Sequence, residues 1–167
     1  MKKYEIKDSK LIILDCCNEP VPVALFNLVK KVTFGANYNF PLPDIQNKNI
    51  EKIIFRGAFN QSINNLPLEL KHLHLGESYN LPIVELPEKI ETLVLSHCFN
   101  HPIRLPNTLK IFKMGMFFNQ PINKLPEKLE YLFVGENFSF PLPELPVSLK
   151  EIKVSPFNKN AEKLNFK

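Results

Sequence analysis

The stretch FNQPINKLP at residues 118–126 decides the fold, because close relatives of it recur along the chain. These are YNLPIVELP at 79–87, FNHPIRLP at 99–106 and FSFPLPELP at 138–146. Counted from the opening aromatic, there are seven copies at spacings of 21, 20, 20, 19, 20 and 19 residues: Tyr38, Phe59, Tyr79, Phe99, Phe118, Phe138 and Phe157. So steady a period predicts a solenoid, in which each coil packs on its neighbours.

Each period also contains two apolar residues two positions apart, such as Leu73 and Leu75, which is the spacing of a short half-buried β-strand. Prolines fill the rest of the coil, as in the pair Leu125-Pro126. Because proline lacks a backbone donor and fixes φ, they exclude helix there. We therefore expect a mainly β, right-handed solenoid of about eight coils of 19–21 residues. It should have a parallel β-sheet on one face, extended or tight-turn segments on the other, and no long helices.

An asparagine follows the aromatic in most copies, as at Asn80, Asn100 and Asn119. A side-chain amide repeated at one place in every coil can bond backbone groups of its own turn and of the adjoining turn. We therefore interpret these asparagines as structural residues rather than as groups that perform chemistry.

The length indicates a single solenoid domain, residues 1–167. We divide it into an N-terminal cap with a degenerate first repeat (1–28), the repeats (29–158) and a C-terminal cap (159–167). In the first segment Cys17 stands where later coils have the aromatic. The lysine-rich ends are expected to shield the open edges of the sheet.

The pattern Leu-x-x-Leu-x-Leu, followed by a turn and an asparagine, resembles the leucine-rich repeat. FNQPINKLP and its relatives look like the FNIP repeat, a short variant associated with social amoebae and giant DNA viruses. The resemblance covers roughly residues 29–158, with local departures: Ser62 replaces proline in one copy, and the last copy loses the motif after Asn158. It implies a leucine-rich-repeat-like fold and an interaction role, and it supplies no catalytic residues.

In some members of that family the repeats follow an F-box, the helical segment that docks a ubiquitin-ligase scaffold. Residues 1–28 are too short for one and indicate strand and extended chain. One alternative function is therefore the substrate-recognition part of a ubiquitin-ligase system without its own F-box.

Composition argues against several other functions. Cys16, Cys17 and Cys98 lack the spacing of a zinc site or a disulfide framework, and reduced thiols predict a cytoplasmic protein, in the host cytoplasm if the protein is viral. A net charge of +4, dispersed among acidic residues, favours no nucleic-acid partner, and the one apolar run near the N-terminus is too short to enter a membrane. Without a phosphate-binding loop or a catalytic triad, we expect no enzyme and no cofactor.

The candidate site follows from the strand period, because residues beside the inward leucines point out from the sheet. Each coil then contributes two or three adjustable side chains to one face. The predicted protein-binding residues on this strand face are Lys52, Ile54, Arg56, His72, His74, Thr92, Val94, His97, Ile111, Lys113, Met116, Tyr131 and Phe133.

The composition of this face changes along the array. Its first half is basic, with Lys31 and Lys52 among its residues, and its second half is apolar and aromatic, with exposed Tyr131 and Phe133 expected as anchors. The three nearby histidines (72, 74 and 97) are expected to be solvated imidazoles rather than metal ligands.

We predict a protein–protein interaction module without intrinsic catalysis, whose partner the sequence does not identify. The alternative is a self-assembling structural or scaffold protein, a homo-oligomer joined through its end strands or through its sheet face.

Overall fold

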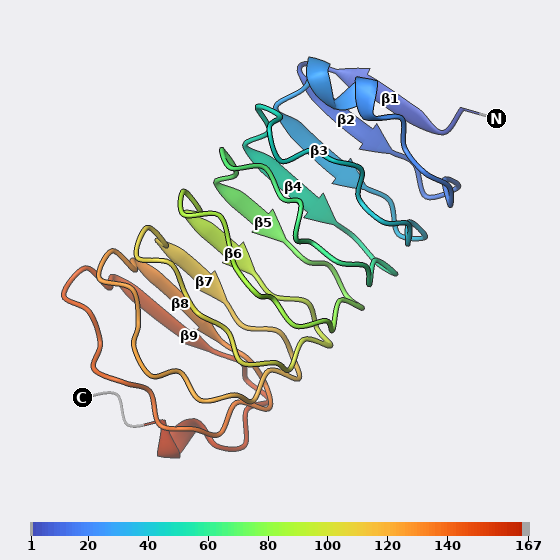
Figure 1. Cartoon of the computed structure of the whole chain (residues 1–167). Helices are drawn as coiled ribbons and strands as arrows, with labels where there is room; N and C mark the ends of the chain where they lie inside the picture. Colours follow the sequence, from blue (N-terminus) through green and yellow to red (C-terminus); the bar gives the residue numbers. More distant parts are fainter. Residues whose placement is uncertain (1, 165–167) are drawn as a thin grey trace.

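The computed structural model describes residues 2–164 and contains one nine-stranded sheet, whose strands follow one another in chain order (Figure 1). The strands are β1 (Tyr4–Lys7), β2 (Lys10–Ile13), β3 (Lys31–Phe34), β4 (Lys52–Phe55), β5 (His72–His74), β6 (Thr92–Val94), β7 (Ile111–Lys113), β8 (Tyr131–Val134) and β9 (Glu151–Val154). Strands β2 to β9 pair in parallel, each with the next. The predicted β-solenoid with a parallel sheet is thus confirmed.

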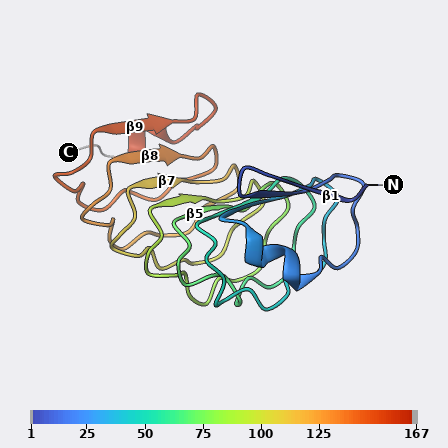
Figure 2. The same ribbon diagram turned by 90° about the horizontal axis from the view of Figure 1, so that it is seen from above.

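The chain makes about seven complete turns rather than eight, because the parallel strands β2 to β9 are joined by seven return segments. Seen from above, the strands lie along one wall of the coil and the return segments along the opposite wall (Figure 2). The described helices are two short 3₁₀ turns, η1 (Val23–Leu28) and η2 (Ala161–Lys163). Neither has the length and apolar character that a membrane crossing needs.

The N-terminal end of the sheet is closed by a β-hairpin. Strand β1 pairs antiparallel with β2, and the two-residue turn between them has positive φ at both Asp8 (50°) and Ser9 (57°). That turn geometry matches the twist of paired strands, so β1 covers an edge that a solenoid would otherwise leave open. The expectation of strand and extended chain up to residue 28 is wrong at η1, which turns Phe26 into the core beside Phe34.

The core is built around a ladder of six stacked aromatic rings, which come from consecutive coils. Neighbouring ring centroids are 6.1–6.3 Å apart and the rings are close to parallel, at interplanar angles of 1–16°. All members are buried: Tyr38, Phe59, Tyr79, Phe99, Phe118 and Phe138. Inward strand residues such as Leu93 and Leu132 pack against this ladder.

The predicted seventh member of the ladder is wrong, because the side chain of Phe157 is 70% exposed. Ile152 pairs with Leu132, and counting on from these strand residues brings Asn158, not Phe157, level with Phe138. The buried amide of Asn158 donates hydrogen bonds to the carbonyl oxygens of Gly135 (2.7 Å) and Phe138 (3.1 Å). Matching the letters Phe-Asn placed the last copy one residue too early.

The asparagines after the aromatics form a second ladder, now of hydrogen bonds between coils. Each side-chain oxygen accepts a bond from the backbone N–H of the equivalent residue one coil later. The acceptor and donor pairs are Asn39 and Asn60 (2.8 Å), Asn60 and Asn80 (2.9 Å), Asn80 and Asn100 (3.1 Å), Asn100 and Asn119 (2.9 Å), and Asn119 and Ser139 (3.0 Å). The expectation that these amides bond the adjoining turn is confirmed.

A third ladder lies at the residue before each strand, and we call it the flank ladder. Its members alternate in charge and are linked by backbone hydrogen bonds of 2.8–2.9 Å: Lys30, Glu51, Lys71, Glu91, Lys110, Glu130 and Lys150. Side-chain ion pairs join Glu51 to Lys30 (3.4 Å) and Lys71 (3.8 Å), and equivalent pairs follow at 2.9 and 2.6 Å. A lysine hydrogen bond lowers the pKa of each of the three carboxyl groups. With four lysines and three glutamates, the ladder has opposite charges on every pair of neighbouring members and a net charge of +1.

Replacing Tyr79 by phenylalanine should stabilise the protein. Its hydroxyl is buried and has no hydrogen-bond partner among the described residues, and burial raises the pKa of Tyr79 to about 12. Burying a hydroxyl without a partner costs about 1–3 kcal/mol, and the neighbouring ladder positions already hold phenylalanine. We expect Tyr79→Phe to raise the free energy of unfolding by about 1 kcal/mol in urea titrations. Tyr38→Phe is the control, because that hydroxyl has an acceptor in Pro41 O at 3.5 Å; a loss of stability in Tyr79→Phe would contradict the reasoning.

Candidate functional site

The strand face carries two rows of outward side chains, set by the parallel register. The first row opens each strand and runs Lys10, Lys31, Lys52, His72, Thr92, Ile111, Tyr131 and Glu151. The second row stands two residues later and runs Ile12, Thr33, Ile54, His74, Val94, Lys113, Phe133 and Lys153. Buried residues such as Leu73 lie between the rows and point into the core, so both rows face outward.

Six of the predicted site residues meet in one depression, which we call the strand-face hollow. It has a volume of about 310 Å³ and lies at the ends of β5 to β8. The six residues are His74, Val94, His97, Lys113, Met116 and Phe133, and Glu136 and Phe157 line it with them. Residues from neighbouring coils thus converge on one surface.

The hollow combines an apolar floor with one charge of each sign, Lys113 and Glu136. Phe133 is half-buried, while Met116 and Phe157 present exposed apolar side chains at its edge. Burial lowers the pKa of the His74 imidazole, and the charges of Lys113 and His97 lower it further. His74 is therefore mainly neutral at pH 7, and Lys113 supplies the principal positive charge. Such a site suits an apolar side chain.

The other seven predicted residues lie on the strand face or beside it, outside the hollow: Lys52, Ile54, Arg56, His72, Thr92, Ile111 and Tyr131. The Nδ1 atom of His72 is 3.1 Å from Thr92 Oγ1, so these two side chains form a contact between strands. The expectation of exposed aromatics is wrong in detail, because Tyr131 and Phe133 are both half-buried. The ammonium groups of Lys113 and Lys153 lie 5.4 and 6.0 Å from the ring centre of Tyr131 and cover it.

The histidines of this face do not converge with other donors into a metal site. Within residues 2–164, no group of three or more His, Cys, Asp or Glu side chains is placed to hold a metal ion. His74 and His97 face the same hollow, whereas His72 contacts Thr92 in the first row.

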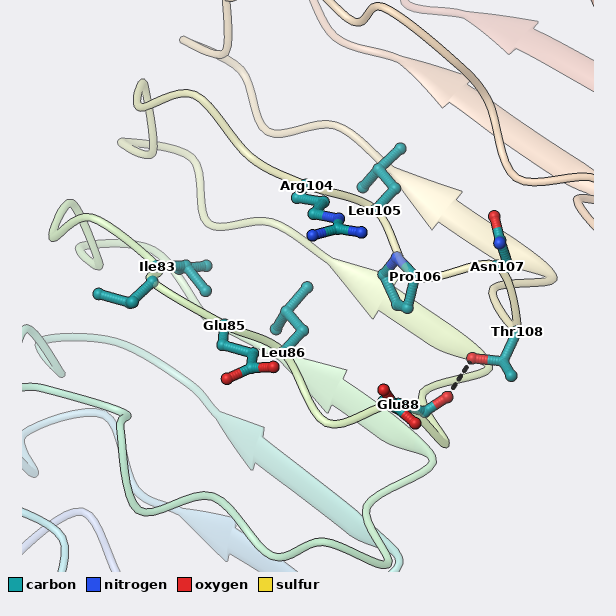
Figure 3. A pocket seen from close by; sticks show the side chains of 10 residues that line it. Ile83, Glu85, Leu86, Glu88, Arg104, Leu105, Pro106, Asn107 and Thr108 are labelled. Carbon is teal, nitrogen blue, oxygen red and sulfur yellow. Dashed lines mark hydrogen bonds between the residues drawn. The ribbon is translucent and has the colours of Figure 1, made fainter.

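Sequence reasoning missed the depressions on the return side, two of which, of about 490 and 690 Å³, share lining residues. These two flank Arg104, which Figure 3 shows across a gap from Glu85 and Leu86 of the preceding coil. Ile103 and Leu105 are only half-buried there, whereas the equivalent residues of neighbouring coils are buried. Glu85, Glu88 and Arg104 line the smaller depression, whereas Arg104 and Lys124 are the charged residues that line the larger one.

The spacing of the repeats contained a signal for these two depressions, which together we call the notch. From Phe99 to Phe118 the chain takes 19 residues, one fewer than from Tyr79 to Phe99. The missing residue falls in the return segment, where Arg104 alone separates the two apolar positions that two residues separate in the next coil. A coil one residue short does not reach as far outward, which opens the notch between its neighbours.

These features define the class of the protein, a leucine-rich-repeat-like parallel β-solenoid. No protein-family model matches the chain, and no curated protein matches it. Among solved structures it is similar to CroV588, a giant-virus protein described as a novel circular leucine-rich-repeat structure, with 22% sequence identity and a TM-score of 0.32. The match covers 92% of this chain and 41% of that protein, so this chain spans less than half the length of CroV588.

Proposed function

We propose that this chain is a non-catalytic protein-interaction module of the FNIP-repeat type, which binds a protein partner through its strand face. Proteins with this solenoid fold commonly mediate protein interactions. The observation that carries the proposal is the strand-face hollow, where Phe133, Met116 and Lys113 from neighbouring coils surround one depression. An apolar side chain of the partner would enter the hollow, between Lys113 and Glu136.

The chemistry of the hollow supports recognition rather than catalysis. A catalytic site needs a nucleophile or an acid–base pair held at hydrogen-bonding distance in a place from which water is excluded. The lining offers two imidazoles, one lysine, one carboxylate and the Ser155 hydroxyl on an open surface, together with thioether and aromatic groups. Aromatic residues and methionine are enriched where proteins bind one another.

The test compares proteins captured from a protist lysate by the wild type and by two matched variants. Phe133→Ser removes the aromatic side chain that lines the hollow, and Phe140→Ser removes an exposed aromatic that does not line it. We expect a partner that wild type and Phe140→Ser retain and that Phe133→Ser loses. With that partner purified, Phe133→Ser should weaken the Kd at least tenfold. Identical captures by all three forms would overturn the proposal.

Self-assembly is the second candidate, and one observation favours it. Strand β9 pairs with β8 and with no further described strand, so its other edge is open and can pair with a second copy. A solution of the pure protein analysed by sedimentation velocity tests this candidate. The backbone N–H groups of Glu151 and Ser155 point toward β8, so by alternation that of Val154 points to the open edge. An increase of the sedimentation coefficient with concentration that Val154→Pro abolishes would favour assembly over the partner-binding function.

A further inference from the structure

The first row of the strand face holds three lysines from the adjacent parallel strands β2, β3 and β4, which we call the lysine row, and Lys7 of β1 stands opposite the first of them. Lys10 is paired in register with Lys31, and Lys31 with Lys52. Each projects outward because the next residue, such as Val32 or Ile53, is buried in the core. Parallel strands lie about 4.8 Å apart, so three like charges stand side by side on one surface.

No ion pair within the described chain neutralises the lysine row. Of the acids near the row, Glu51 has its carboxylate 3.4 Å from Lys30 and 3.8 Å from Lys71 and only adds a weaker attraction to Lys31. Glu5, which stands opposite Ile12, pairs with Lys2 at 3.2 Å. Like charges directly opposite each other on neighbouring strands destabilise a sheet. Only one residue upstream, the flank ladder alternates its charges and avoids this repulsion. The lysines of the strand face thus repel one another, whereas the alternating charges of the flank ladder attract one another.

We propose that the lysine row binds an acidic peptide segment of the protein partner, laid across β2, β3 and β4. This inference rests on the proposed function and specifies the chemistry of the partner. An extended chain advances about 3.3 Å per residue, so four or five consecutive Asp or Glu residues span the two strand spacings of the row. The positive row ends after Lys52, because burial and the charge of Lys52 lower the pKa of His72.

An acidic peptide fits this surface better than a single-stranded nucleic acid does. Proteins that bind single strands place aromatic side chains beside their lysines, on which the bases stack. The second row beside the lysines consists of Ile12, Thr33 and Ile54, of which Thr33 is buried. Carboxylates need only the charge and the hydrogen-bond donors of the lysines, and the surface provides these.

The experiment measures the binding of a fluorescent octaglutamate peptide by anisotropy at low salt. The row variant carries Lys10→Gln, Lys31→Gln and Lys52→Gln. The control variant carries Lys89→Gln, Lys124→Gln and Lys128→Gln, which lie on exposed return segments and lower the net charge by the same three units. We expect the row variant to bind at least tenfold more weakly, and the control variant to stay within twofold of wild type.

A stability readout accompanies the binding assay. Removal of the lysine row should raise the Tm, because repulsion is relieved, whereas the control variant should not gain stability. Added salt should raise the Tm of the wild type more than that of the row variant, because salt screens the same repulsion. A Tm that falls in the row variant would contradict the repulsion on which the proposal depends.

Three outcomes would overturn the proposal: no binding by wild type, equal weakening in both variants, or tighter lysine-dependent binding of a 15-nucleotide oligothymidylate than of octaglutamate. The octaglutamate peptide has no apolar side chain, so Phe133→Ser should leave its Kd unchanged. Failure of the peptide to bind would therefore overturn the proposal for the lysine row and leave the proposed function untouched. The capture result for Phe133→Ser would stand or fall separately.

Discussion

Phe118→Ala should lower the free energy of unfolding by about 3–5 kcal/mol, as measured by urea titration with circular dichroism. The Phe118 ring is fully buried, with the rings of Phe99 and Phe138 each 6.1 Å away and Phe112 edge-on at 6.4 Å. Its removal leaves a gap in the middle of the aromatic ladder. The coils cannot close on this gap, because asparagine side chains and backbone bonds fix their spacing at that corner.

Tyr131→Ala is the matched comparison, because it removes a ring of similar size from the strand face. That ring is half-buried and covered mainly by two lysine side chains, so the loss should be well below that of Phe118→Ala. Equal losses would contradict the assignment of inward and outward positions. If Phe118→Ala does not fold, Phe118→Leu should still fold and should be less stable than wild type, because leucine fills only part of the gap.

Gly115→Ala should be nearly as damaging, with a loss of about 3 kcal/mol in the same titration. A Cβ atom on Gly115 would lie 1.7 Å from the carbonyl oxygen of Ser96 in the preceding coil. Because the obstacle is backbone, no side-chain rotation relieves it, and one coil must move away from the other. Gly35→Ala is the comparison, because its nearest backbone contact would be 2.7 Å. A loss in Gly35→Ala as large as that in Gly115→Ala would contradict the argument from close approach.

The period of the sequence was sufficient to predict the parallel sheet and most of the core, because each coil repeats the same inward and outward positions. It failed where a coil departs from that period. At the C-terminal end the letters Phe-Asn matched the motif, but distance from β9 decides which side chain turns inward, and that is Asn158. The turn η1 has no counterpart in the repeats, so the period carried no information about it.

The candidate site was predicted in part for the same reason. Alternation along a strand identified Lys113 and Phe133 as outward residues, but it did not show which of thirteen such side chains share a depression. That depends on how neighbouring coils stand relative to one another. The sequence placed Lys31 and Lys52 on the basic half of this face, but it did not place Lys10 beside them, because the first repeat is degenerate and the register of the strands makes Lys10 and Lys31 neighbours.

The flank ladder also bears on how such an array can evolve. Repeat proteins lengthen and shorten by duplication and loss of whole coils. Loss of the one coil that carries Lys71 would place Glu51 directly beside Glu91, and duplication of a single coil would likewise set two equal charges side by side. Changes by two coils, about 40 residues, preserve the alternation. The charge pattern therefore favours inheritance of coils in pairs, so that the unit of duplication is twice the unit of structure.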